Sequence, residues 1–429
     1  MADTLKSLRG MHDVLPAQSA AWQYLEQHVR DLMQSYCFEE IRTPLLEQTA
    51  LFSRSIGDVT DIVEKEMYTF ADRNGESISL RPENTASCIR SAIEHGLLQP
   101  GQVSRLWYQG TMFRYERPQK GRYRQFVQFG AEVYGIPGPQ IEAELILLSA
   151  NLWRRLGLDR EMHLEINTLG TADERTHYRE QLVAYLRDYS DALDADSQRR
   201  LESNPLRILD SKNPAMQAVL AEAPTLLDTI GDESREHFDG LQTLLRGFDI
   251  DVRVNTRLVR GLDYYSHTVF EWVTDRLGAQ GTCCAGGRYD GLTEQLGGKL
   301  TPAVGWAIGA ERILALLEET QGVPVRAVAD VYVVMGGGVA AESGLQLAEE
   351  LRTQLPGAGV ICHAGGGSMK SQFKKADKSG AQCALVLGEQ ELADGTVTVK
   401  FLRQQSEQQT MARAGLAQFI QSAIQTDGV

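Results

Sequence analysis

Positive charge is concentrated in segment 113–124, which reads Phe-Arg-Tyr-Glu-Arg-Pro-Gln-Lys-Gly-Arg-Tyr-Arg and holds four arginines and one lysine against a single glutamate. The chain as a whole is acidic, with 43 basic and 57 acidic residues. Average surface composition does not account for such a local excess. Clustered arginines suit phosphate, because the planar guanidinium donates two parallel hydrogen bonds to it. The segment therefore predicts a phosphate-binding site.

The same segment alternates polar and aromatic residues on both sides of a Pro-Gln-Lys-Gly tip at 118–121. This pattern predicts two antiparallel strands joined by a loop. We expect Arg114 on the first strand and Arg122 just past the tip, while Gln128 and Glu132 share one face of the second strand. Such a face suits a nucleotide phosphate beside a polar substrate. A solvated hairpin with surface arginines is the alternative.

The order of residues in this hairpin resembles motif 2 of the class II aminoacyl-tRNA synthetases, in the version of the bacterial histidyl-tRNA synthetases. Residues 18–44 resemble motif 1, which builds the dimer interface in that family, so the resemblance implies a homodimer. The expected helix there places apolar residues along one face, followed by a strand at 40–41 and a turn at Pro44. The apolar positions are Trp22, Leu25, Val29, Leu32 and Met33.

A turn at 80–85, Leu-Arg-Pro-Glu-Asn-Thr, presents a carboxylate and a hydroxyl together. Both groups suit an α-ammonium group, which needs hydrogen-bond acceptors. A helix N-cap with Thr85 opening the helix is an equally good interpretation. The family usually has glycine where Asn84 stands. Because asparagine tolerates a left-handed backbone, we expect Glu83 and Thr85 to keep the family's role in binding the amino acid.

Two segments resemble signatures specific to the histidine family: Leu-Val-Arg-Gly-Leu-Asp-Tyr-Tyr-Ser-His-Thr-Val-Phe-Glu at 258–271 and Cys-Ala-Gly-Gly-Arg-Tyr-Asp-Gly at 284–291. A neutral imidazole offers one donor and one acceptor. The resemblance implies that Glu132 and Tyr265 satisfy the two nitrogens and that Tyr264 lines the pocket. Core aromatics are the alternative for the tyrosine pair. The histidine-binding residues implied are Glu83, Thr85, Gln128, Glu132, Tyr264 and Tyr265.

Segment 303–313, an apolar strand that runs through a glycine into a helix with Glu-Arg, resembles motif 3. The resemblance assigns the α-phosphate of ATP to the catalytic residues Arg114 and Arg260, and the distal phosphates to Arg312. It assigns adenine stacking to Phe126 and adds Glu116 and Arg122 to the ATP site. Mg²⁺ would accompany ATP as part of the substrate complex. No tightly bound cofactor and no metal site in the protein are expected.

The length of 429 residues and the apolar content of 42% predict two or three domains. Dense charge at helical spacing predicts a helical insertion at 171–245 within a catalytic domain at 1–325. Strands at 330–335, 359–363, 382–387 and 396–402 alternate with helices at 340–355, 369–378 and 411–424. This order predicts a three-layer α/β domain at 326–429, which the resemblance makes an anticodon-binding domain. The fold class is therefore α/β, and the resemblance implies an antiparallel catalytic sheet with flanking helices in the larger domain.

The C-terminal segment carries a further basic face, because Lys370, Lys374, Lys375 and Lys378 recur at helical spacing after Gly-Gly-Gly-Ser. Such a face suits RNA phosphate, and a solvated lysine face is the alternative. The net charge of −14 argues against general attraction to nucleic acid, so no DNA partner is expected.

Several other classes of protein are excluded by pattern. No P-loop sequence occurs, and the glycine turn at 336–341 lacks the acidic residue that a dinucleotide site has about 20 positions on. No apolar run reaches the roughly 18 residues that span a bilayer, so we expect a cytoplasmic protein without membrane contact. The six cysteines form no Cys-x-x-Cys pair, and we expect buried thiols.

Taken together, the resemblance implies ATP-dependent attachment of L-histidine to tRNA-His through a histidyl-adenylate, with release of AMP and pyrophosphate. A catalytically inactive, synthetase-like regulatory subunit of histidine biosynthesis is the alternative. Such paralogues typically lose the C-terminal domain and erode the histidine signatures, and this chain retains both. An RNA-binding module without chemistry would not require Glu83, Glu132 and Tyr265 together.

Overall fold

The computed structural model describes residues 4–57, 60–211, 213–278, 281–323, 327–339 and 341–425. The chain divides into two compact units, Met1–Pro324 and Val325–Val429. The domain boundary that we expected at residue 325 lies outside the described residues.

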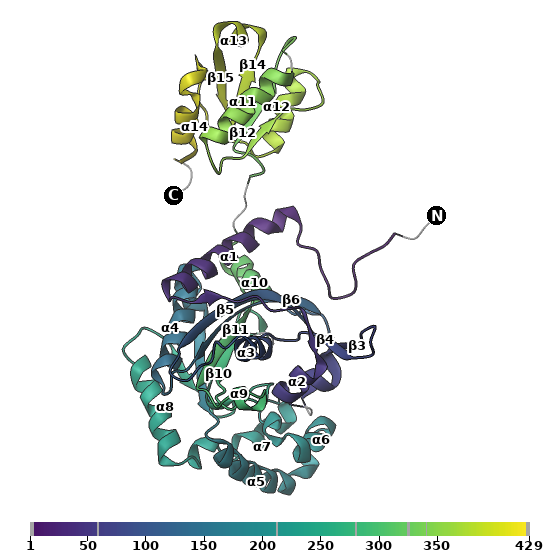
Figure 1. Ribbon diagram of the computed structural model, residues 1–429, viewed down its shortest axis with the longest axis vertical. Helices are drawn as coiled ribbons and strands as arrows, with labels where there is room; N and C mark the ends of the chain where they lie inside the picture. The colour runs from purple at the N-terminus through teal and green to yellow at the C-terminus, as the bar shows by residue number, and fades with distance from the viewer. Residues whose placement is uncertain are drawn as a thin grey trace. The chain divides into compact units, whose positions relative to one another are not determined.

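The larger unit is built on a mostly antiparallel sheet flanked by helices (Figure 1). The pairs β1–β5 and β7–β8 are parallel, and the other described pairs are antiparallel. In spatial order the eight described strands are β1 (Glu39–Glu40), β5 (Ser104–Phe113), β6 (Gln125–Tyr134), β11 (Ala303–Gly309), β10 (Thr282–Arg288), β9 (Ser266–Val273), β7 (His163–Thr168) and β8 (Val252–Val254). A smaller sheet has the order β2 (Leu46–Gln48), β4 (Ser77–Leu80), β3 (Tyr68–Ala71).

The two faces of the large sheet have different neighbours because side chains alternate along each strand. On β6, Phe129, Ala131 and Val133 enter a buried core with α1 (Pro16–Ser35), α4 (Gln140–Arg155) and α10 (Ala310–Thr320). Gln128 and Glu132 occupy the opposite face, as the sequence predicts. That face meets the start of α3 (Thr85–Glu94), and α2 (Thr49–Ile56) packs against α3. The sheet thus has one face that packs mainly on an apolar core and one that carries the polar groups of the hairpin.

Segments 18–44 and 303–313, which resemble motifs 1 and 3, form the predicted elements, except that the first strand begins and ends one residue earlier than expected. Along α1, Leu25, Val29, Leu32 and Met33 are buried, and β1 follows at Glu39–Glu40. The strand β11 runs through Gly309 directly into α10. The mixed α/β class and the mostly antiparallel sheet with flanking helices are therefore confirmed.

The arginine-rich hairpin is formed by β5 and β6, which pair from Ser104 with Tyr134 to Phe113 with Gln125. Arg114 lies one residue beyond the end of β5, not on the strand as expected. The pairing of β5 with β6 ends there because the two strands diverge around the loop. One further hydrogen bond remains, from Arg114 N to Arg124 O at 3.0 Å. An isolated bridge between Gln119 and Arg122 closes the tip.

Helices occupy the segment after β7, where we expected a helical insertion. They are α5 (Ala172–Asp188), α6 (Ala195–Ser203), α7 (Gln217–Ala221) and α8 (Asp232–Leu245). The first begins with a capping box, in which Thr171 Oγ1 accepts from Glu174 N at 3.3 Å and Thr171 N donates to Glu174 Oε2 at 2.7 Å. That residues 171–245 are an insertion within a catalytic domain stays a prediction.

The smaller unit is an α/β domain. Its described strands follow the order β13 (Val360–Cys362), β12 (Val331–Met335), β14 (Cys383–Leu387), β15 (Thr396–Phe401) and β16 (Gln409–Ala412). Its described helices are α11 (Ala341–Gln354), α12 (Met369–Lys378), α13 (Glu389–Asp394) and α14 (Leu416–Gln425). The predicted start of the first helix, at residue 340, lies outside the described residues.

Two expectations for local structure were wrong. The last helix begins at Leu416, not at 411, because residues 409–412 pair with β15 as β16, and α13 was not expected at all. Cys37 is exposed and Cys362 is half-buried, so the cysteines are not all buried thiols. Both errors concern tertiary contacts that a local pattern does not record.

Among the described helices, none combines the length and the apolar character needed to cross a membrane.

Candidate functional site

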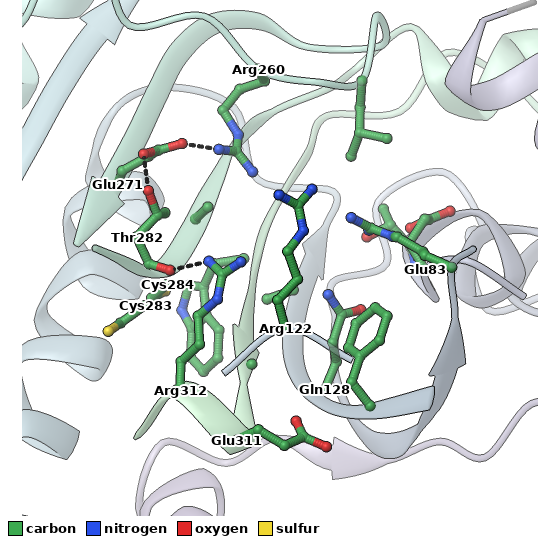
Figure 2. A pocket seen from close by; sticks show the side chains of 18 of the residues that line it. Glu83, Arg122, Gln128, Arg260, Glu271, Thr282, Cys283, Cys284, Glu311 and Arg312 are labelled. Carbon is green, nitrogen blue, oxygen red and sulfur yellow. Dashed lines mark hydrogen bonds and ion pairs between the residues drawn. The ribbon is translucent and has the colours of Figure 1, made fainter. Parts of the chain in front are cut away.

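A cavity of about 270 Å³ opens on the polar face of the large sheet (Figure 2). Residues from the hairpin, from the start of α3, from loop 258–265 and from strands β9, β10 and β11 line it. Eleven residues proposed from the sequence meet there: Glu83, Thr85, Arg114, Glu116, Arg122, Phe126, Gln128, Arg260, Tyr264, Tyr265 and Arg312. The twelfth, Glu132, lies directly beneath the wall and bonds to Thr85.

Four of these residues are arginines that crowd their charges into one cavity. Burial lowers the pKa of Arg114, Arg122 and Arg312 below the ordinary value, and like-charged neighbours lower it further. Arg260 acts in this way on Arg114, Arg114 acts on Arg122, and Arg122 acts on Arg312. Such mutual repulsion is relieved by an anion with several charges. The cavity is therefore electrostatically suited to a polyphosphate.

Each arginine is held by a different part of the fold. Arg114 Nε donates to the carbonyl of Pro82 at 2.9 Å, and Arg122 forms an ion pair with Glu116. Arg312 donates to the carbonyl of Thr282 and contacts Gly121 O at 3.4 Å.

The remaining arginine, Arg260, forms an ion pair with Glu271 (Figure 2). Its own burial would lower the pKa of Arg260, but the charge of Glu271 and two neighbouring tyrosines raise it overall. The guanidinium therefore stays charged inside the protein.

The ring of Phe126 lies beside this charge, with the Arg114 guanidinium carbon 5.5 Å from the ring centroid. Both groups line the cavity. A flat aromatic face next to an arginine is a surface on which a base can stack.

Glu83 caps a helix and also faces the cavity, so the geometry is compatible with both interpretations of the sequence. Its carboxylate accepts from Thr85 N at 2.6 Å and from Ala86 N at 3.1 Å, so it caps the start of α3. The same side chain also lines the cavity. Burial raises the pKa of Glu83 in spite of these hydrogen bonds.

Asn84 has a different role from the one expected. Its φ is −120°, which is not left-handed, so conformational tolerance is not what the position requires. Its side-chain oxygen accepts from Thr43 Oγ1 at 2.6 Å and from Arg81 Nη1 at 2.9 Å. Glycine offers no such acceptor. Asn84 thus fastens the turn of Glu83 to the segment that follows α1 and β1.

Glu132 is fully buried and surrounded by hydroxyl donors. Thr85 Oγ1 donates to it at 2.7 Å and Tyr108 OH at 3.4 Å, and Tyr289 OH donates to the other carboxylate oxygen. Burial raises the pKa of Glu132 to about 8, although these hydrogen bonds oppose the rise. The hydroxyl donors hold the carboxyl group of Glu132 in one orientation, and they favour its charged form against the effect of burial.

Two glycines make room for this arrangement. A Cβ at Gly305 would collide with the Glu132 carboxylate and lie 2.6 Å from the carbonyl of Ala131. A Cβ at Gly287 would come within 2.9 Å of the Tyr265 ring. The glycines in the strands are therefore required by the polar groups packed over them.

Gln128 lines the cavity and carries an acceptor that is unpaired within the described part of the chain. Its Oε1 is buried and has no hydrogen-bond partner among the described residues. Leaving a buried acceptor unpaired costs about 1–3 kcal/mol, so a ligand donor at this position would recover that free energy. Tyr264 and Tyr265 stand nearby as a tilted pair, with ring centroids 4.6 Å apart.

Sequence reasoning missed four contributors. Tyr289 and Tyr108 are hydrogen-bonded to Glu132, whereas Glu271 and Thr282 hold Arg260. Tyr289 belongs to the segment at 284–291 that carries the family resemblance, which was a signal for it. Nothing local marked Thr282 or Tyr108, because their roles depend on strand pairing.

No group of three or more His, Cys, Asp or Glu side chains suited to a metal ion occurs among the described residues. The carboxylates around the cavity are instead engaged with backbone N–H groups, hydroxyls or arginines.

Comparison with protein families gives two matches. The family model for histidyl-tRNA synthetase matches residues 10–313, well over half of the chain. The chain belongs to the histidyl-tRNA synthetase family. A second model, for an anticodon binding domain, matches residues 330–423 in the smaller unit of this family member.

Solved structures agree with this membership. A histidyl-tRNA synthetase from S. aureus is 34% identical over 97% of this chain and 100% of that one, with a TM-score of 0.81. One from Nostoc sp. shares the fold at 19% identity, covering 98% and 100% of the two chains, with a TM-score of 0.71. A Bacillus halodurans protein described as an ATP phosphoribosyltransferase regulatory subunit/histidyl-tRNA synthetase shares the fold at 21% identity over 90% and 99%, with a TM-score of 0.64.

Proposed function

We propose that this protein activates L-histidine with ATP and transfers it to tRNA-His. The observation that carries the proposal is the single cavity in which four arginines meet the acceptors Gln128 and Glu83 above the buried Glu132. The arginines suit a triphosphate, and the acceptors suit an amino acid with a polar ring. Close similarity to the S. aureus synthetase over the whole chain supports the same assignment.

In the first step a carboxylate oxygen of histidine attacks the α-phosphorus of ATP, and pyrophosphate leaves. Arg114 and Arg260 stabilise the charge that develops on the α-phosphate, while Arg122 and Arg312 hold the distal phosphates. Phe126 stacks on adenine, and Glu116 completes the ATP site. ATP enters as its Mg²⁺ complex. The protein contributes position and charge and needs no covalent nucleophile.

Histidine is recognised by groups that its ring and its ammonium group can pair with. Glu83, Thr85 and Gln128 accept from the α-ammonium, and Glu132 and Tyr265 face the two imidazole nitrogens, with Tyr264 beside the ring. An amino acid without these polar atoms would leave buried groups unpaired. Such a site rejects it by a factor of roughly 10⁴ to 10⁵. This pocket requires no editing site.

In the second step a ribose hydroxyl of the terminal adenosine of tRNA-His attacks the histidyl carbonyl, and AMP leaves. The smaller unit binds the anticodon, supported by its family match and by α12, where Lys370, Lys374, Lys375 and Lys378 are all exposed. We propose a homodimer through motif 1, supported by the exposed Leu45 and Leu46, which directly follow that segment. The cytoplasmic location stays a prediction.

ATP–pyrophosphate exchange tests the proposal. We expect exchange with L-histidine and with no other amino acid, and charging of tRNA-His. Exchange with a different amino acid, or none at all, would overturn it. A protein that gives no exchange but binds and activates an ATP phosphoribosyltransferase would instead be the regulatory subunit.

A matched pair of arginine variants tests the site. Arg260→Ala should abolish exchange while the circular dichroism spectrum stays unchanged. Arg253→Ala, which removes an exposed arginine paired with Asp251, should keep the rate. A folded Arg260→Ala protein with near-normal exchange would remove Arg260 from the mechanism.

A further inference from the structure

Thr282 is linked to Arg312 directly and to Arg260 through Glu271. Thr282 Oγ1 donates to Glu271 Oε2 at 2.8 Å, and Glu271 Oε1 accepts from Arg260 Nη1. The backbone carbonyl of the same Thr282 accepts from Arg312 Nη1. Figure 2 shows these contacts as a continuous path along one wall of the cavity. The side chain of Thr282 thus serves one arginine and its backbone serves the other.

The pairing of β9 with β10 places Thr282 and Glu271 on one face of the sheet. Thr282 pairs with Val273 and Cys284 pairs with Trp272, so Cys283 is an extra residue on β10. A β-bulge of this kind re-aims the neighbouring groups. Glu271 lies two residues before Val273 on β9 and therefore shares its face. Because Thr282 pairs with Val273, its side chain lies on the same face as Glu271, diagonally across from it.

We propose that Glu271 and Thr282 are positioning residues for the activation step: Thr282 fixes the Glu271 carboxylate, which in turn aims Arg260 at the α-phosphate. The inference rests on the proposed function, because it assigns these two residues a task in that reaction. Neither residue was assigned a role from the sequence.

The hydrogen-bond capacity of the two groups supports this. One oxygen of Glu271 is bound by Arg260 and the other by Thr282, so the carboxylate cannot rotate without losing a partner. Arg260 has five N–H donors, and Glu271 engages Nη1. Its Nε is buried and has no hydrogen-bond partner among the described residues. The guanidinium is therefore fixed at one end and keeps donor capacity for a substrate oxygen.

A purely structural ion pair is the competing explanation. Glu271 and Thr282 both line the cavity, and their side chains are joined to an arginine that also lines it. Positioning predicts an effect on the rate of the chemical step that is separate from folding and from ATP affinity. A structural ion pair predicts a loss of stability with no separate effect on the rate of the chemical step.

Substitutions at Thr282 distinguish the two explanations. Thr282→Val removes the hydroxyl and keeps the carbonyl that binds Arg312. We expect kcat for histidine-dependent exchange to fall about ten- to hundredfold, since a misplacement of about 1 Å costs up to roughly 100-fold. The KM for ATP should stay within about twofold, which corresponds to less than 0.5 kcal/mol, because the carbonyl that binds Arg312 is kept. Thr282→Ser retains a hydroxyl and should restore most of the rate.

A double-mutant cycle tests whether Thr282 acts through Glu271. Glu271→Gln should lower kcat, and adding Thr282→Val to it should lower kcat little more, because the carboxylate to be fixed is already gone. Additive losses would overturn the proposal, as would an unchanged kcat in Thr282→Val.

A readout without turnover separates this inference from the proposed function. In ¹⁵N-arginine NMR, the Nε–H signal of Arg260 is identified by its absence from Arg260→Lys. Thr282→Val should accelerate its exchange with solvent, and Thr282→Ser should not. An unchanged signal in Thr282→Val refutes the positioning role even if exchange activity is present. If neither the natural protein nor any variant supports ATP–pyrophosphate exchange, the proposed function fails. The NMR measurement still decides whether Thr282 orders Arg260.

Discussion

Tyr289 donates a hydrogen bond to the carboxylate of Glu132 across 157 positions of sequence, and both side chains are buried. Tyr289 begins the turn after β10, whereas Glu132 lies near the end of β6, and β11 separates the two strands. The contact passes over β11 at Gly305, where a side chain would collide with the carboxylate. This phenol fixes one oxygen of Glu132, as Thr85 fixes the other.

The burial of Glu132 predicts a pH-dependent stability. Its pKa is raised from 4.5 to about 8, so between these values the folded protein holds a proton that the unfolded chain has released. Between these two pKa values the free energy of unfolding therefore falls by roughly 1 kcal/mol per pH unit as pH rises. The stabilisation by the protonated Glu132 side chain is fully present below the unfolded pKa. We expect the free energy of unfolding of the natural protein, relative to Glu132→Gln, to decrease with pH in urea titrations. A difference that does not change with pH contradicts the raised pKa.

The unpaired oxygen of Gln128 predicts that this side chain is retained for a ligand and not for stability. Gln128→Leu removes a buried acceptor that has no partner among the described residues, so the melting temperature should stay equal or rise. The KM for histidine should increase roughly tenfold or more, since hydrogen bonds to charged groups contribute about 1.5–3 kcal/mol. Thermal melts and exchange kinetics check the two halves. A destabilised variant with an unchanged KM would contradict the assignment.

The close approach at Gly305 predicts a severe packing defect. Gly305→Ala should lower the free energy of unfolding by roughly 3 kcal/mol or more, because the new methyl group meets a buried carboxylate and a backbone carbonyl. Gly291→Ala is the matched control, since a Cβ there meets nothing within 4 Å and its φ is −69°. That change should stay within about 1 kcal/mol. Equal stabilities of the two variants in denaturant titrations would show that Gly305 is not constrained.

The helices after β7 reach the loop that carries the tyrosine pair. Arg175 on α5 donates to the carbonyl of Tyr265, and Asn204 donates to Asp263 Oδ1 at 3.1 Å. Arg175→Met should therefore raise the KM for histidine roughly tenfold, about 1.4 kcal/mol, with little change in the KM for ATP.

Arg179→Met is the control for this prediction. Arg179 lies one turn further along α5 and donates to the carbonyl of Glu202, within the same group of helices. Its loss should leave the KM for histidine unchanged. If both variants behave alike in exchange kinetics, the contact to Tyr265 has no special influence on histidine binding.

Local pattern was sufficient for the parts of the site that are contiguous in sequence. The alternation around 118–121 predicted the hairpin β5–β6 and the shared face of Gln128 and Glu132. The glycine before Glu311-Arg312 predicted the passage from β11 into α10. These predictions succeeded because side-chain direction along a strand or helix follows from backbone geometry alone.

What the sequence by itself determined is the local chemistry: an arginine-rich hairpin, a tyrosine pair after an arginine, and the family to which they belong. The tertiary structure decided how these groups are held, because strand order and register bring together residues that are distant in sequence. The Tyr289 hydroxyl on Glu132, and the path from Arg260 through Glu271 and Thr282 to Arg312, exist only after the strands pair. The pairing of Thr282 with Val273 brings Thr282 and Glu271 to one face of the sheet, and no local pattern records which residues pair.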